Sequence, residues 1–195
     1  MTDSQPPILL PTLWRTCRSL ANKCRLEILA ELIRLSPQDV SQVAGALGLS
    51  EAVASQYLRH LNARGLIRAS RSGRFVSYSA TPNPTLHESA RLLNALRYAI
   101  EKEKATPDDL FSHLTAFTHW RRIQIMQRLA TDECTATELM TRTGISRSAL
   151  MRHVKKLIAR GYVFHDKRKG SYRRTSRKDA MSKTLMKLVM QQAQT

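Results

Sequence analysis

The chain contains one sequence unit twice, and this internal repeat restricts the possible folds more than any other feature. Residues 21–32 match residues 118–129 at an offset of 97, and residues 43–67 match residues 139–163 at an offset of 96. The apolar positions of the two copies are in phase, and glycines fall at the same places in both. Self-similarity of this extent indicates a tandem duplication, so each copy should fold into the same small module.

The first part of each copy predicts two helices and a tight turn. In the first copy the apolar stripe of the first helix consists of Leu26, Leu29 and Ile33. The second helix begins at a capping box in each copy, Asp39-x-x-Gln42 or Thr135-x-x-Glu138. A glycine, Gly48 or Gly144, then ends this helix, as the turn of a helix-turn-helix requires.

The second part of each copy predicts a third helix and a β-hairpin. The third helix should run from an N-cap serine, Ser50 or Ser146, to a glycine cap, Gly65 or Gly161. Two short β-runs around a glycine turn follow it, and they form a wing. These runs are residues 66–70 and 74–79 in the first copy, and 162–166 and 171–176 in the second. The expected fold class is therefore mainly α with small β-hairpin wings (α+β), built as tandem winged helix-turn-helix domains.

Two further amphipathic segments, residues 86–104 and 178–192, are expected to be flanking helices of the dimerisation type. Linkers are indicated at residues 82–84 and at Thr106-Pro107, where the proline suits the first turn of a helix. We therefore expect a first module at residues 12–104, with its long C-terminal helix, and a second module at residues 106–195.

The charge of the chain points to a polyanionic partner. The 32 Lys and Arg residues outnumber the 15 Asp and Glu residues, which gives a formal net charge of +17. So large a charge opposes compaction through self-repulsion, and binding to a polyanion offsets it. The densest basic run lies at residues 165–178, most of which fall in the second predicted wing.

Nothing in the sequence predicts a membrane partner. No stretch approaches the roughly 20 apolar residues that cross a bilayer, and the N-terminus lacks the basic region that opens a signal peptide. Three cysteines are too few and too scattered for a disulfide framework. We therefore expect a cytoplasmic protein.

Residues 50–80 resemble the arsenic-repressor (ArsR) family of winged helix-turn-helix transcriptional regulators. The tetrapeptide SQYL at residues 55–58 is similar to the S-Q-H-L core of that family's recognition helix, and ARGLI followed by RSGRFVSY is similar to its helix end and wing. The second copy is more distant: His153 matches the family histidine, but its neighbours differ. The resemblance implies binding to double-stranded DNA, and it implies dimer contacts through the first and last helices of a module.

The residues that sense metals in many ArsR proteins are missing here. The family's C-V-C-D-L segment aligns with residues 39–43 and with residues 135–139, neither of which contains a cysteine. The predicted last helix of the first module offers His87 alone where another family site uses two histidines. We expect no metal and no other cofactor, and no catalytic motif suggests an enzyme. Buried thiols are the favoured interpretation of Cys17 and Cys24, and Cys134 precedes a helix start, where reactivity is the less favoured interpretation. Redox or effector sensing by these three cysteines is left open.

The third helix of a helix-turn-helix enters the major groove, where glutamine pairs with adenine and arginine with guanine. The candidate DNA-binding residues of the first module are Ser50, Ser55, Gln56 and Arg59 on the helix, and Arg71 and Arg74 on the wing. Those of the second module are Ser146, Arg147, Ser148, Arg152 and Lys155 on the helix, and Lys167, Arg168, Lys169, Arg173 and Arg174 on the wing.

These patterns favour a sequence-specific regulator, a repressor by resemblance. The alternatives are a sequence-tolerant architectural DNA-binding protein and, less favoured, a winged-helix protein–protein scaffold. The two modules could form an intramolecular pseudo-dimer, or two chains could form a homodimer with four modules. The sequence leaves both arrangements open.

Overall fold

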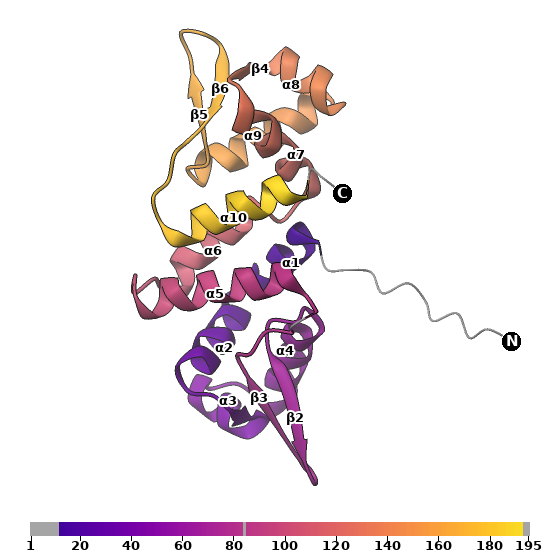
Figure 1. The fold of residues 1–195 in the computed structure, drawn as a ribbon, viewed down its shortest axis with the longest axis vertical. Coiled ribbons are helices and arrows are strands. Elements are labelled where there is room, and N and C mark those ends of the chain that lie inside the picture. The colour runs from indigo at the N-terminus through magenta and orange to yellow at the C-terminus, as the bar shows by residue number, and fades with distance from the viewer. Residues whose placement is uncertain (1–11, 84, 193–195) are drawn as a thin grey trace, which may run out of the picture.

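A computed structural model of the chain describes residues 12–83 and 85–192 (Figure 1). The first half comprises α1 (Leu13–Leu20), α2 (Lys23–Arg34), β1 (Gln38–Asp39), α3 (Val40–Leu47), α4 (Glu51–Ala63), β2 (Arg68–Ser72), β3 (Phe75–Ser79) and α5 (His87–Glu101). The second half comprises α6 (Pro107–Ala116), α7 (Trp120–Thr131), β4 (Cys134–Thr135), α8 (Ala136–Thr143), α9 (Arg147–Ala159), β5 (Val163–Asp166), β6 (Ser171–Arg174) and α10 (Ala180–Gln191). The order of elements is the same in both halves, which confirms the predicted fold of two tandem winged helix-turn-helix modules.

Local hydrogen bonds position the helix-turn-helix in both modules. The Asp39 carboxylate accepts a bond from the backbone N–H of Gln42 at 2.8 Å, and the Gln42 side chain accepts one from the Asp39 N–H at 2.9 Å. Thr135 and Glu138 make the same reciprocal pair at 3.3 and 2.7 Å. The glycine that follows has a left-handed φ in both modules, 62° and 67°. Both predicted capping boxes and both turns are therefore confirmed.

Each wing is part of a three-stranded antiparallel sheet, and the third strand was not predicted. The strand orders are β1-β3-β2 and β4-β6-β5. In the first sheet Gln38 pairs with Tyr78, and in the second Cys134 pairs with Tyr172. A strand of two residues is too short to show an alternating pattern, so only its long-range pairing identifies it.

Two local expectations need correction, and one helix boundary was not predicted. The unpredicted boundary separates Cys17 on α1 from Cys24 on α2, because Asn22 caps α2 through its side chain, which accepts from the backbone N–H of Arg25 at 3.0 Å. The two thiols therefore lie on different helices. Ser146 occupies the N-cap position of α9, but its side chain makes no capping hydrogen bond. The helix expected at residues 86–104 ends at residue 101, and Lys104 takes a left-handed φ of 56°.

The centre of the molecule is made of the flanking helices of both halves. Helix α5 packs against α10, and α6 packs against α1 and α2, so one continuous apolar core joins the halves. Figure 1 shows α5 and α10 one above the other, with the β2–β3 wing at one end of the molecule and the β5–β6 wing at the other. Within the described ranges, no helix combines the length and apolarity needed to span a membrane.

Candidate nucleic-acid interface

Helix α4 presents a polar outer face. Its N-cap Ser50 accepts a hydrogen bond from the backbone N–H of Val53 at 3.4 Å. Ala54, Leu58 and Leu61 are fully buried and fix the rotation of the helix. As predicted, Gln56 and Arg59 are exposed, whereas Ser55 is half-buried.

The wing of the first module turns at Gly73, which has a φ of 60°. Arg71 on β2 and Arg74 in the turn are both exposed. The guanidinium carbon of Arg74 lies 5.2 Å from the centre of the Phe75 ring, and Phe75 itself is 64% exposed. An exposed phenylalanine flanked by arginine was missed, although its position in a wing was a usable signal.

Helix α9 is rotated in the same way as α4, because Leu150, Val154 and Leu157 are buried. The predicted residues on its outer face are all exposed: Ser146, Arg147, Ser148, Arg152 and Lys155. Two apolar side chains, Met151 and Ile158, are exposed beside them. The face of α9 is thus more cationic and more apolar than the face of α4.

The second wing gathers the predicted basic residues around one turn. The Asp166 carboxylate accepts from the backbone N–H groups of Arg168 and Lys169 at 2.9 and 3.3 Å, which orders the turn. The exposed basic residues there are Lys167, Arg168, Lys169, Arg173 and Arg174. Lys169 is 3.6 Å from the Glu133 carboxylate, so its charge is partly compensated. Arg173 lies over Phe164 at 4.5 Å, a second exposed aromatic that was missed.

His153 is a packing residue of α9, because its ring is only 4% exposed. The ring centre lies 4.4 Å from that of His119, and neither ring nitrogen of His153 has a hydrogen-bond partner in the described part of the chain. Burial, and then the nearby His119 and arginines, lower the pKa of His153 to about 4. The ring is therefore neutral near pH 7. This buried, neutral ring packs inside the module rather than contacting phosphate.

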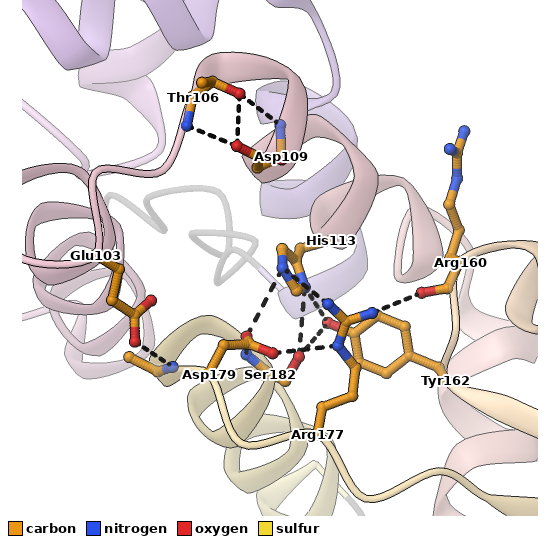
Figure 2. Close-up of polar contacts among 10 residues, drawn as sticks. Glu103, Thr106, Asp109, His113, Arg160, Tyr162, Arg177, Asp179 and Ser182 are labelled. Atoms are coloured by element: carbon orange, nitrogen blue, oxygen red, sulfur yellow. Dashed lines mark hydrogen bonds and ion pairs between the residues drawn. The ribbon is translucent and has the colours of Figure 1, made fainter.

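A polar cluster fixes the end of α9 to the central helices (Figure 2). Nδ1 of His113 is 2.7 Å from the Tyr162 hydroxyl, which is 3.2 Å from the hydroxyl of Ser182. Arg177 donates to the Arg160 carbonyl and to the Asp179 carboxylate, each at 3.2 Å. Burial is the main reason why the pKa of His113 is lowered. No sequence motif predicted this cluster, whose members come from segments far apart in the chain.

The cysteines are isolated, and two of them are buried. Cys17 and Cys134 are buried and Cys24 is half-buried, all as free thiols. Burial raises the pKa of Cys17 and of Cys134, which disfavours their reactive thiolate forms. Across residues 12–83 and 85–192, no group of three or more His, Cys, Asp or Glu side chains is arranged to hold a metal ion.

Comparison with known families assigns a separate match to each module. The model described as "Bacterial regulatory protein, arsR family" matches residues 22–69, from α2 into β2. The model of the MarR family matches residues 118–171, from α7 to the start of β6. No curated protein matches the chain. Both matches confirm winged helix-turn-helix modules, and the first supports the predicted ArsR-like character. The flanking helices α1, α5, α6 and α10 lie outside the matched ranges.

Proposed function

We propose that this chain, a DNA-binding transcription regulator with two tandem winged helix-turn-helix modules, is a sequence-specific repressor. The observation that carries the proposal is the outer face of α4, where Gln56 and Arg59 are exposed above a buried apolar side. In a helix-turn-helix this face meets base edges in the major groove. A bidentate pair of either side chain with its preferred base discriminates by roughly 1–3 kcal/mol.

We propose different tasks for the two modules. The exposed polar side chains of α4 suit base recognition, whereas the cationic face of α9 and the second wing suit contacts to phosphates. Arg152 and Lys155 on α9 would position the protein, together with Lys167, Arg173 and Arg174 on the wing. Such a division predicts an operator whose base sequence is constrained where α4 binds. The same operator should tolerate base changes where α9 and the second wing bind.

We further propose that the modules, residues 12–104 and 106–195, act as an intramolecular pseudo-dimer. Corresponding helices meet, α1 with α6 and α5 with α10, as equivalent patches do in a two-fold interface. Because α4 and α9 differ in sequence, one chain would prefer an asymmetric site. A homodimer with four modules is the alternative, and light scattering with and without operator DNA separates the two.

A sequence-tolerant architectural role is the competing function, favoured by the basic second wing. Selection of fragmented genomic DNA by the purified protein, sequenced after washes at increasing salt, separates the two functions. A specific regulator retains a few fragments with a common motif at salt that removes all other DNA. An architectural protein loses all fragments together, because released counterions drive its binding. Repression is tested with a reporter behind a retained fragment, whose transcription should fall when the protein is expressed.

A further inference from the structure

A groove of about 640 Å³ lies between the two modules. Thr12 and Trp14 line it from the first half, and Trp120, Ile123 and Gln124 line it from α7. The first turn of α5, including Glu88, and Gln192 at the end of α10 complete the wall. Its volume suits a small organic molecule.

The tryptophan that α7 contributes to the groove has no counterpart in the first copy. At the offset of 97 that relates the first helices of the copies, Trp120 corresponds to Lys23. Lys23 forms an ion pair with Asp108 at 2.6 Å, which joins α2 to the start of α6. The position equivalent to Trp120 is therefore engaged in an ion pair, whereas Trp120 itself lines the groove together with Trp14.

The groove has two aromatic walls that already interact with planar cations. The guanidinium carbon of Arg15 lies 5.1 Å from the centre of the Trp14 ring, and that of Arg121 lies 5.3 Å from the Trp120 ring. Both indole rings still line the groove, so part of each is available to a ligand. Indole rings are the best aromatic partners for cations, and they also stack on flat apolar molecules.

Three side chains of the groove, Thr12, Glu88 and Gln124, have oxygens that can accept further hydrogen bonds. The side-chain oxygens of Thr12 and Gln124 are buried and have no hydrogen-bond partner among the described residues. Glu88 is held by one weak bond from the amide of Gln192 at 3.3 Å, and burial raises the pKa of its carboxyl group. A ligand that brings a positive charge and N–H donors would satisfy these groups.

We propose that this groove binds a planar aromatic cation as the effector of the regulator. The flat ring would lie against the two indoles, and its charged nitrogen would face Glu88 and the free oxygen of Gln124. The groove is lined by α5 and α7, which connect to different recognition helices, so a ligand that binds one placement of these helices more tightly than another would shift the spacing of α4 and α9. Binding itself needs only the groove, whereas the effector role rests on the function proposed above.

The two tryptophans of the chain both line the groove, so tryptophan fluorescence, excited selectively over that of the five tyrosines, monitors this site. The probe is 4-aminoquinoline, a planar cation near pH 7, and the control is quinoline-4-carboxylate, an anion of similar shape. The full chain is titrated without DNA. We expect saturable quenching by the amine and none by the carboxylate, and calorimetry should give the same affinity.

Glu88→Gln tests the charge recognition, and Glu101→Gln, at the exposed far end of the same helix, is its matched control. We expect the Glu88 variant to bind the amine roughly tenfold more weakly or worse and the Glu101 variant to bind as the parent does. Melting curves establish that both variants are folded. Absence of saturable quenching, equal binding of the two probes, or an unchanged affinity in Glu88→Gln overturns the site.

The effector role is tested separately, on whichever DNA fragment survives the salt washes. Saturating amine should change the affinity for that fragment at least about threefold, and Glu88→Gln should abolish the response. If quenching is saturable but the affinity for DNA does not change, the effector role is overturned, whereas the binding site for the cation is still supported. If no fragment is retained, the proposed function fails, and the fluorescence result still decides whether the groove binds the cation.

Discussion

Arg177 donates a hydrogen bond from Nη1 to the main-chain carbonyl oxygen of Arg160 at 3.2 Å, and so ties the segment before α10 to the end of α9. The same guanidinium lies 5.4 Å from the Tyr162 ring, within the cluster of Figure 2. In the first module the hydroxyl of Ser89 donates to the carbonyl of Arg64 at 2.8 Å. The C-terminal end of the recognition helix is therefore held in both modules, but by different side chains. Ser89 on α5 holds the end of α4, and Arg177, just before α10, holds the end of α9.

Replacing Arg177 with methionine should destabilise the protein by about 1–2 kcal/mol, because the carbonyl of Arg160 and the carboxylate of Asp179 each lose a partner. Urea denaturation measures the loss. Lys178→Met, at the exposed neighbouring position, is the control and should stay within about 0.5 kcal/mol of the parent. Equal losses in the two variants would contradict a structural role for the Arg177 cluster.

The double variant Gln56→Ala with Arg59→Ala should erase the preference for the operator and keep weak binding to random DNA, because only base contacts discriminate between sequences. Competition binding with operator and scrambled duplexes measures the ratio of affinities. His60→Ala with Asn62→Ala, exposed on the last turn of the same helix, should keep that ratio. A normal ratio in the first variant would mean that α4 does not contact bases.

Neutralising Arg173 and Arg174 to glutamine should weaken binding to all sequences to a similar degree. Each lost phosphate contact should also reduce the slope of log affinity against log salt by about 0.9. The control is Lys183→Gln with Lys187→Gln, which removes the same charge from exposed positions on α10. If the control changes the slope as much, net charge rather than the second wing accounts for the binding.

Stability should fall as pH decreases from about 6.5 to about 4, partly because of His153. The pKa of this ring is about 4 in the folded protein and near 6.5 when unfolded, so the unfolded chain binds the proton first. The contribution is fully present well above pH 6.5, and roughly 3 kcal/mol of it is lost by pH 4.

His153→Tyr, which introduces the residue found at the repeat position 57, should make this pH dependence shallower. Urea denaturation at several pH values measures the slope. His60→Gln, at an exposed position on α4, should leave it as it is. If stability depends on pH in the His153 variant as it does in the parent, the pKa of this ring does not differ between the folded and unfolded states.

The parts of the interface that could be predicted are those encoded by neighbouring residues. Gln56 and Arg59 were placed on the outer face of α4 because the buried positions Leu58 and Leu61 fix the helix rotation. The exposed Phe75 and Phe164 were missed although they lie in wings, because a hydrophobic residue in a short strand is generally expected to face the core. The cap of Ser146 was expected from residue type, but its side-chain hydrogen bond is not formed.

By itself, the sequence determined the duplication, the helix-turn-helix of each module and the wings. Capping boxes, glycine turns and helical periodicity act over a few residues, so a linear pattern records them. Only the tertiary structure decided that α5 lies against α10, that Trp14 and Trp120 share one groove, and that His113 reaches Ser182, 69 residues away. Those contacts depend on how the apolar faces of distant helices pack, and that geometry has no local signature in the chain.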